Sequence, residues 1–574
     1  MLARMLRGAA LGVIVLALVG GLPWDADLDG YRNVGPGPHD CNDRDAAVHP
    51  GAADQPLDGV DQDCDGIDRA AGSNVLLITI DTLRARNLGI YGYERDTSPH
   101  MDELGREGAV FLHAYSNTSW TIPSLASLFT SRHPTHHRTT MPKSSLPESL
   151  PYLPDLLKQR GYETATFLQS AYPLLTMGFA RGYDTMVRPA NYKTPEILKW
   201  IERQRDKPFF LWVHYSEPHT PYTPSPPYDK MFVPESWKDK RDHARYWKSD
   251  ECQKFYDEDP DAARLRLGFY DARIRESDEH VGEIMAKLDQ LGLTDETLII
   301  LSADHGEEFF EHRGCDHGQT LYDEVLHIPL LLRHPSVIPP GRRVDEQVRI
   351  VDIMPTVLDA LELPIPPGTA GRSVLPLARG IGGDRPVLGG FLSNTEQAVV
   401  IRHQGMKYVY SPQRTALRQK IKAETEELYD LRADPEEREN LAASSHPRLE
   451  HFRRKARRWV EGPRPAPAPK VEFDQRTVER LRALGYLAPA PEGVPSDGKP
   501  PATAVVKPAA TPPAKPAALQ PPSGISPAPA APAPAPVPPA AAAKPAAAAT
   551  AIPAAAAAVT TVAPTPVAPP AGAR

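Results

Sequence analysis

Acidic and imidazole side chains follow two apolar segments of the sequence. Asp81 comes directly after the apolar run at residues 74–80, and Asp304 and His305 follow a second run at residues 297–301. The carboxyl ends of parallel strands meet at one edge of a sheet, so we expect the three side chains to lie together. Oxygen and nitrogen ligands of this kind suit a divalent cation such as Ca²⁺, Mn²⁺, Zn²⁺ or Mg²⁺. The alternative is that these aspartates only cap helices.

A hydroxyl group is the candidate nucleophile beside this metal site. Pro123 predicts the first turn of a helix and so places Thr121 at the mouth of that helix. Unpaired backbone N–H groups and the helix dipole favour an anion there. A hydroxyl next to a metal ion could attack a phosphoryl or sulfuryl centre. The competing interpretation is that Thr121 is only an N-cap.

The elements that must hold these side chains alternate along the chain. A third apolar run, at residues 209–213, ends just before His214, and all three runs are typical of strands buried on both faces of a parallel sheet. Between the runs at residues 209–213 and 297–301, apolar residues recur at the spacing of a helix, at Tyr270, Ile274, Val281, Ile284 and Leu288. We therefore predict an α/β fold with a large, doubly wound, mostly parallel sheet flanked by helices.

Composition separates a globular stretch at residues 73–487 from its flanks. Of the 64 prolines, 24 lie in residues 488–574, so this Ala/Pro-rich tail is expected to be disordered. The net charge of the chain is −8, and no basic field exists to attract nucleic acid. We expect no nucleic-acid partner.

Residues 1–24 have the features of a targeting segment. Arg4 and Arg7 precede an apolar run at residues 8–22, which is shorter than the roughly 20 residues of a membrane-spanning helix. We expect a signal peptide, with a membrane anchor as the alternative. The protein is then exported to the periplasm, the cell envelope or the medium, and this segment is a candidate for attachment to the membrane or envelope.

Residues 25–70 form an acidic segment, with twelve Asp against two Arg up to residue 68. A D-x-D-x-D-G pattern occurs twice, at Asp25, Asp27 and Asp29 and again at Asp61, Asp63 and Asp65. In calcium loops, alternate carboxylates of this pattern bind the same ion. No Glu stands at the twelfth position, so a standard EF-hand is not expected. The segment resembles the Asp/Cys-rich metal-binding repeats of bacterial surface proteins, and we predict structural calcium in residues 25–68. A solvated acidic linker is the alternative.

The four cysteines fit an exported protein. Cys41 and Cys64 lie in the acidic segment, which has too few apolar residues to hold itself together, and we expect them to pair. Cys252 and Cys315 are expected to be free.

A set of sequence blocks covers nearly all of residues 73–487. The blocks are IDTLRARNLGIYGY (80–93), TSPHMDELGREG (97–108), TIPSLASL (121–128), FFLWVHYSEPHTPY (209–222), SADHGEEFFEHRGCDHGQTLYDE (302–324), VDIMPTVLD (351–359) and ELYDLRADPEERENLA (427–442). In content and order they resemble the sulfatase family of the alkaline phosphatase superfamily. The resemblance implies a catalytic domain at residues 73–388 and a smaller C-terminal α+β subdomain at residues 389–487, whose Arg402 and Lys407 we expect as exposed strand charges.

The resemblance also assigns roles to residues. Asp81, Asp304 and His305 look like the metal ligands, joined by Thr121, which occupies the first position of the family's C/S-x-P-S-R nucleophile motif. His219 resembles the imidazole that contacts the transferred group or protonates the leaving oxygen. His317 resembles a further substrate or metal contact. His214 and Glu217 are additional candidates nearby.

Departures from the family pattern affect the expected chemistry. Sulfatases oxidise Cys or Ser at the nucleophile position to formylglycine, and the extra methyl of Thr121 prevents formation of that aldehyde. Leu125 replaces the Arg of the motif, Thr82 stands where many sulfatases have a second Asp, and His305 replaces an Asn. A Thr nucleophile beside Asp, Asp and His resembles the lipoteichoic-acid synthases, phosphoethanolamine transferases and nucleotide pyrophosphatases of the same superfamily.

We therefore predict a metal-dependent hydrolase or transferase that acts on phosphate or sulfate esters through Thr121, with Ca²⁺, Mn²⁺ or Zn²⁺ at the active site. The substrate class is a small-molecule, glycan or lipid ester. Two alternatives stay open. One is a true sulfuric ester hydrolase with unconventional chemistry, and the other is a catalytically inactive surface binding protein with the sulfatase fold.

Overall fold

A computed structural model of the chain describes residues 41–42, 44–50, 52, 60, 62, 64, 73–140, 144–169, 174–187, 194–205, 207–233, 262–383, 385–389, 398–415, 422–462 and 465–483. The predictions for residues 1–24, for the tail at 488–574, for Cys252 and for the six calcium-loop aspartates lie outside the described residues. Among the helices that can be examined, none is long and apolar enough to cross a bilayer.

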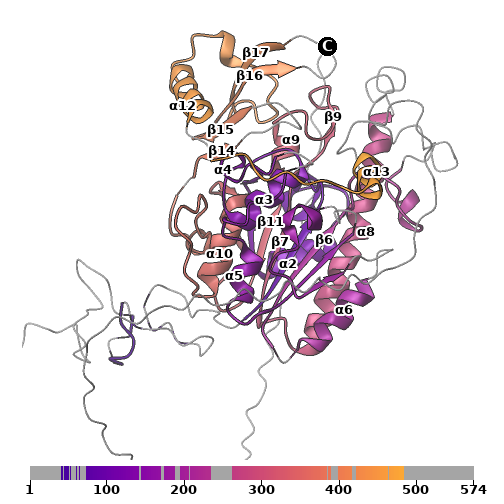
Figure 1. Ribbon diagram of the computed structural model, residues 1–574, viewed down its shortest axis with the longest axis vertical. Coiled ribbons are helices and arrows are strands. Elements are labelled where there is room, and N and C mark those ends of the chain that lie inside the picture. Colours follow the sequence, from indigo (N-terminus) through magenta and orange to yellow (C-terminus); the bar gives the residue numbers. More distant parts are fainter. Residues whose placement is uncertain are drawn as a thin grey trace, which may run out of the picture. The chain divides into compact units, whose positions relative to one another are not determined.

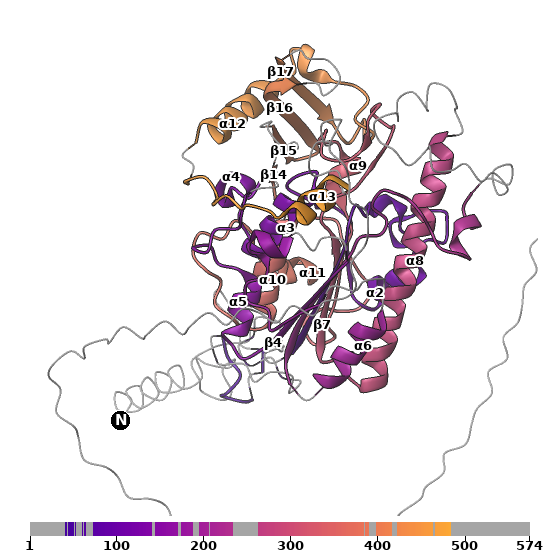
Figure 2. The ribbon, with the colours of Figure 1, turned by 45° about the vertical axis from the view of Figure 1, so that its right-hand side comes forward.

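The largest element is an eight-stranded sheet, with helices packed on both of its faces (Figures 1 and 2). Every neighbouring pair is parallel except those made by β11, which runs antiparallel to both of its neighbours. In spatial order the strands are β12 (Arg342–Val344), β2 (Ala109–Phe111), β11 (Leu330–Arg333), β7 (Thr297–Ala303), β1 (Asn74–Ile80), β6 (Phe209–Tyr215), β4 (Glu163–Leu168) and β5 (Thr185–Val187). The predicted mostly parallel α/β sheet is confirmed.

The three apolar runs of the sequence are the central strands β6, β1 and β7, and every residue in them is buried. Buried strands of this kind need apolar side chains on both faces, which explains the continuous runs. Ile80 at the end of β1 pairs with Tyr215 of β6 and with Ala303 of β7. The residues that follow, Asp81 and Asp304, therefore emerge side by side at one edge of the sheet.

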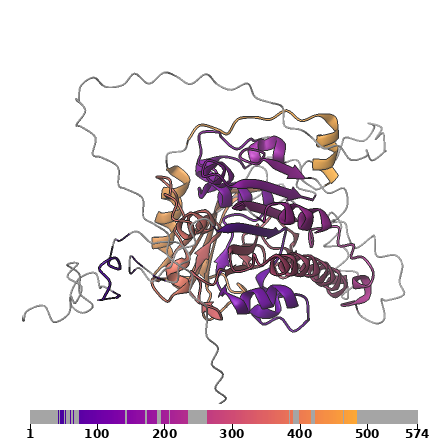
Figure 3. The ribbon, with the colours of Figure 1, turned by 90° about the horizontal axis from the view of Figure 1, so that it is seen from below.

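Helices cover the two faces of this sheet, as the view from below also shows (Figure 3). One face carries α2 (Pro99–Glu107), α6 (Thr194–Arg203) and α8 (Ala262–Leu291), and the other carries α3 (Thr121–Thr130), α5 (Leu153–Lys158) and α10 (Ile353–Ala360). The helical pattern predicted from Tyr270 to Leu288 lies within α8. The remaining helices are α4 (Pro134–His137), α9 (Asp323–Leu326), α11 (Leu375–Ala378), α12 (Leu449–Glu461) and α13 (Gln475–Ala483).

Two small sheets lie in the connections of the main domain. One consists of β10 (His327–Ile328), β3 (Ala114–Tyr115) and β13 (Val348–Arg349), and the other is the hairpin of β8 (Glu308–Phe309) and β9 (Cys315–Asp316). Cys315 is disulfide-bonded, so the expectation that it is free was wrong. The expected Cys41–Cys64 disulfide is confirmed.

The C-terminal part of the globular region is an antiparallel sheet with one helix against it. The strands are β14 (Val387–Gly389), β15 (Val399–His403), β16 (Met406–Thr415) and β17 (Lys422–Asp430). Phe452 and Ala456 of α12 form a core with Ile401, Tyr408 and Leu428 of the strands. This smaller strand-and-helix unit was expected from the sequence.

Two charges on these strands are buried, contrary to the expectation that they are exposed. The ammonium of Lys407 has no exposed surface, and its Nζ lies 2.8 Å from Asp323 Oδ1 and 2.6 Å from Glu437 Oε1. Arg402 donates to Asp323 as well, and its guanidinium lies over the ring of Tyr115. Asp323 belongs to α9 of the main domain, so these ion pairs join the C-terminal sheet to that domain.

Candidate active site

Two carboxylates and one imidazole meet at the edge of the central sheet. Asp81 follows β1, Asp304 follows β7 on one side of β1, and His214 lies in β6 on the other side, paired with Thr79. One ligand atom from each of the three lies within 4.8 Å of the other two, and all three residues are buried. This spacing is suitable for a single metal ion bound by oxygen and nitrogen.

The polar atoms that face one another in this cluster lack hydrogen-bond partners. Asp81 Oδ1, Asp304 Oδ2 and His214 Nε2 are buried and unsatisfied. Leaving buried carboxylate oxygens unpaired is costly, and a cation between them would remove that cost. The residues present therefore fit a divalent metal ion.

Backbone and side-chain contacts hold the ligands in place. Asp304 Oδ1 accepts hydrogen bonds from the backbone N–H groups of Thr82, at 3.3 Å, and His305, at 2.9 Å. His214 Nδ1 lies 2.8 Å from the hydroxyl of Thr79, which also accepts from the indole of Trp212. Burial and the neighbouring Asp81 raise the pKa of Asp304 well above its usual value. This shift is the effect of two acidic groups that share one buried position.

His305 lies between this cluster and the candidate nucleophile. Its Nε2 is 3.6 Å from Asp81 Oδ1, 3.5 Å from Asp304 Oδ2 and 3.3 Å from Thr121 Oγ1. Its Nδ1 lies 2.9 Å from the carbonyl oxygen of Gly306, which can only accept, so Nδ1 carries the proton and Nε2 has a lone pair toward the cluster. Burial and the charge of His317 lower the pKa of His305 well below its usual value. The predicted ligand set of Asp81, Asp304 and His305 therefore lies together.

Thr121 is the first residue of α3 and is buried. The N-cap position belongs to Trp120, so the interpretation of Thr121 as an N-cap was wrong. Ser124, one turn further on, donates to the carbonyl oxygen of Asp304 at 2.6 Å and ties the start of α3 to the end of β7. The helix thus presents the Thr121 hydroxyl directly beside the ligands.

His317 lies next to His305, and His219 lies next to His317. The ring centres of His317 and His305 are 4.5 Å apart, and those of His317 and His219 are 4.9 Å apart. His219 Nδ1 donates to the carbonyl oxygen of Thr220, so its buried, unsatisfied Nε2 is available to a ligand. The residues predicted as catalytic are therefore all close to the carboxylate pair.

Three stretches of the chain match models of known protein families. Residues 73–363, just over half of the chain, match the family model described as "Sulfatase". The chain belongs to the sulfatase family. In addition, residues 310–456 match "N-sulphoglucosamine sulphohydrolase, C-terminal", and residues 40–68 match "Putative metal-binding motif". Both resemblances inferred from the sequence blocks are confirmed.

Relatives of this sulfatase-family chain are named as sulfatases of different substrates. It is 26% identical over 350 residues to an ulvan-active sulfatase of Formosa agariphila, an alignment that covers 54% of the chain and 66% of that enzyme. It is 23% identical to a Δ4,5-hexuronate-2-O-sulfatase of Bacteroides thetaiotaomicron, with 64% and 84% covered.

Solved structures share the fold of this sulfatase-family chain. A phosphonate monoester hydrolase of Agrobacterium radiobacter has a TM-score of 0.56 at 22% identity and covers 68% of this chain and 95% of its own. A 2-O GAG sulfatase has a TM-score of 0.55 at 21% identity, with 72% and 94% covered. The same fold therefore occurs in proteins named for sulfate esters and in proteins named for phosphonate monoesters.

His214 and Glu217, the two additional candidates from the sequence, have different surroundings in the structure. His214 was only a secondary candidate, although its place directly after the apolar run of β6 was a signal equal to that of Asp81. Glu217 was named with it, but its Oε1 accepts from Gln169, at 3.0 Å, and from Arg273, at 2.5 Å. Burial, opposed by Arg273, raises the pKa of Glu217 to about 8. Glu217 thus belongs to a neighbouring hydrogen-bonded cluster.

Glu307 was missed and holds His317 in position. Its Oε1 lies 2.8 Å from His317 Nδ1, and its Oε2 accepts from the hydroxyl of Tyr222 at 3.0 Å. Burial disfavours the charged imidazole, but Glu307 outweighs this effect and raises the pKa of His317 to about 9. His317 is therefore a cation at neutral pH and can donate from Nε2.

The change Glu307→Gln is expected to lower kcat about tenfold or more with little change in KM, because Gln keeps an acceptor for His317 but loses the charge. Steady-state kinetics on an aryl ester test this. Glu103→Gln, on the exposed face of α2, is the matched control and should leave kcat unchanged. Equal loss in kcat for both variants would contradict the positioning role of Glu307.

Proposed function

We propose that this sulfatase-family protein is a metal-dependent hydrolase of phosphate or sulfate esters that uses Thr121 as its nucleophile. The main support is the 3.3 Å distance from Thr121 Oγ1 to His305 Nε2, beside the unsatisfied oxygens of Asp81 and Asp304. The first backbone N–H groups of α3 lie next to Thr121, where they favour an anionic group. A nucleophile, a ligand set and an anion site thus share one buried edge of the sheet.

A divalent cation held by Asp81, Asp304, His305 and His214 would neutralise the oxygens of the ester and lower the pKa of the Thr121 hydroxyl. The side chains provide the rest. Thr121 Oγ1 releases its proton to water and forms a bond to phosphorus or sulfur while the bond to the leaving oxygen breaks. His317, a cation held by Glu307, or His219 gives that oxygen a proton. Water then displaces the group and restores the hydroxyl, and an acceptor alcohol in place of water would make the reaction a transfer.

Of the two kinds of ester, we propose phosphate esters as the better substrates. Threonine cannot become formylglycine, so the aldehyde route to release of sulfate is closed to Thr121. Leu125, which replaces the motif Arg, is fully buried in the core and supplies no cation. A threonine phosphoester, in contrast, needs only water for its release. Relatives are named as ulvan and hexuronate sulfatases, and two similar structures as phosphonate monoester hydrolases, which supports a glycan, lipid or small-molecule ester as the substrate class.

Removal of metal is expected to abolish turnover reversibly. The purified protein would be assayed with matched aryl phosphate diester, phosphate monoester and sulfate substrates, before and after a chelator. Activity on at least one ester should fall to background and return with Mn²⁺, Zn²⁺ or Ca²⁺, because the two buried carboxylates need a cation. Full activity after exhaustive chelation would contradict the proposal, and no turnover of any ester with any of these metals would favour an inactive binding protein.

We also propose that the protein is exported. The Cys41–Cys64 disulfide and the disulfide-bonded Cys315 support an oxidising compartment. Cell fractionation tests this, since recovery of the protein with reduced cysteines in the cytosol would contradict it.

A further inference from the structure

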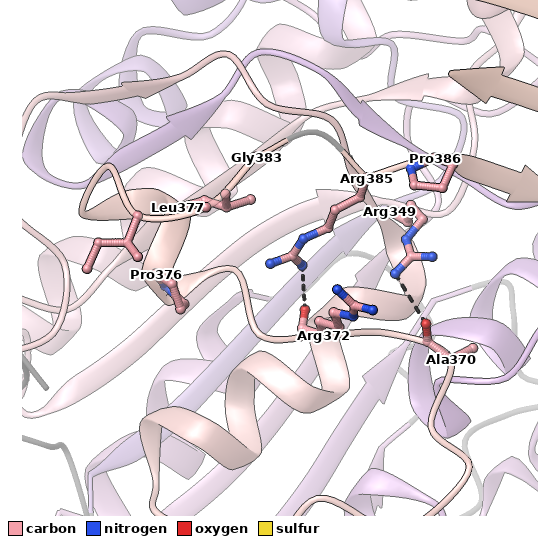
Figure 4. A pocket seen from close by; sticks show the side chains of 10 residues that line it. Arg349, Ala370, Arg372, Pro376, Leu377, Gly383, Arg385 and Pro386 are labelled. Atoms are coloured by element: carbon pink, nitrogen blue, oxygen red, sulfur yellow. Dashed lines mark hydrogen bonds between the residues drawn. The ribbon is translucent and has the colours of Figure 1, made fainter. Parts of the chain in front are cut away.

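A second pocket, lined by arginines, lies away from the carboxylate cluster. Its volume is about 340 Å³, within the usual range for small-molecule sites. Arg349, Arg372 and Arg385 line it together with Leu377, Ile381 and Pro386. Figure 4 shows the three guanidinium groups pointing toward one another across the pocket.

Asp352 is the carboxylate next to these arginines, and its two oxygens already accept four hydrogen bonds. Asp352 accepts from Arg349 Nη2 at 2.7 Å and Nε at 3.2 Å, and also from the backbone N–H groups of Arg349 and Arg372, each at 2.9 Å. Arg385 Nη1 lies 3.6 Å from Asp352 Oδ2, beyond hydrogen-bond distance. Asp352 is therefore shared by Arg349 and, more weakly, by Arg385, and one carboxylate among three guanidinium groups leaves this cluster with a net positive charge.

The remaining two arginines differ in how they are held. Arg385 donates to the carbonyl oxygens of Arg372, at 2.8 Å, and Ser373, at 2.7 Å, which fixes its guanidinium at the pocket wall. Arg372 is exposed and, within the part of the chain that the structure describes, forms no ion pair. Burial, with the charges of Arg349 and Arg372, lowers the pKa of Arg385 despite Asp352. Like charges that face one another at a partly enclosed site attract an anion.

The pocket is separate from Thr121. The hydroxyl of Ser131, which follows the last residue of α3, donates to the carbonyl oxygen of Val351, the neighbour of Asp352. Thr121 is at the opposite end of that helix, and the ten residues of α3 span about 15 Å. The arginine pocket is therefore at the far end of α3 from the nucleophile.

We propose that this pocket binds a phosphate, sulfate or carboxylate group, recognised by the guanidinium groups of Arg372 and Arg385. Planar guanidinium groups match such oxyanions with paired, charge-assisted hydrogen bonds. Leu377, Ile381 and Pro386 form an apolar wall beside the charges, and Ile381 is 58% exposed. That wall suits the organic body of a ligand such as a sugar phosphate, and the volume exceeds the needs of a bare ion.

Calorimetric titration of the full chain tests the site. Inorganic phosphate and glucose 6-phosphate would each be titrated into the Thr121→Ala protein, which removes turnover, and into the same protein carrying Arg372→Ala. Arg372→Ala should remove one class of binding sites or raise its Kd about tenfold or more, since it removes a charge-assisted contact. Arg160→Ala, at an exposed arginine after α5, is the matched control and should change neither isotherm.

The two probes distinguish the source of the anion. Tighter, Arg372-dependent binding of glucose 6-phosphate than of inorganic phosphate indicates a ligand with an organic body against the apolar wall. Equal, Arg372-dependent binding indicates a free anion. Isotherms that Arg372→Ala leaves unchanged for both probes overturn the proposal. Because these titrations use a protein without the Thr121 hydroxyl, failure of the catalytic proposal does not affect their outcome.

Discussion

Replacement of Thr121 by alanine is expected to lower kcat at least about a thousandfold on whichever ester the protein hydrolyses, because no other atom can form the covalent intermediate from the same position. The stability of the fold should change little, since the first residue of α3 keeps its backbone and Trp120 remains the N-cap. The measurement is single-turnover and steady-state kinetics with metal supplied in excess.

Thr130→Ala is the matched control for this change. Thr130 is a buried threonine of the same helix, and its hydroxyl donates to the carbonyl oxygen of Ala126 instead of facing His305. It should keep near-normal kcat, and Thr121→Ser should retain a measurable part of the activity because a hydroxyl is preserved. Near-normal rates in Thr121→Ala would contradict the nucleophile assignment and direct attention to Ser119, whose hydroxyl is buried and unsatisfied.

The largest loss of stability is expected from Lys407→Met. This change leaves Asp323 and Glu437 buried beside each other without the ammonium that lies 2.8 and 2.6 Å from them. Removal of one partner from a buried ion pair typically lowers the free energy of unfolding by about 3–5 kcal/mol. Urea unfolding followed by tryptophan fluorescence would measure the shift in midpoint.

Lys455→Met provides the control for loss of a lysine, because Lys455 is exposed on α12 and should change stability by less than about 0.5 kcal/mol. The double variant Lys407→Met with Glu437→Gln should recover part of the loss, since Glu437 loses its ammonium partner whereas Asp323 keeps its ion pair with Arg402. Equal stability of Lys407→Met and Lys455→Met would mean that the buried pairs do not hold the C-terminal sheet to the main domain.

Those features of the fold that depend on continuous apolar runs could be predicted from the sequence. A strand buried on both faces must be apolar throughout, so residues 74–80, 209–213 and 297–301 revealed the central strands, and the polar residue after each run revealed the edge where the site lies. The reversed strand β11 has no such signal, because its direction depends on its neighbours and not on its own composition.

The parts of the site that were missed depend on contacts between distant segments. Glu307 is significant only because β9 brings His317 to it, and Lys407 is buried only because α9 supplies Asp323. A local sequence pattern predicts that a lysine on a strand is exposed to solvent, because most lysines in proteins are. The burial of a charge is decided by the partner, which lies elsewhere in the sequence.

The pairing of Ile80 with Ala303 makes strand length a condition for metal binding. One residue inserted into either strand would move its aspartate by about 3.3 Å and turn the side chain to the opposite face of the sheet. Evolution is therefore free to exchange one apolar side chain for another along β1 and β7, whereas an insertion or deletion in one of them alone would pull the two carboxylates out of reach of a common ion.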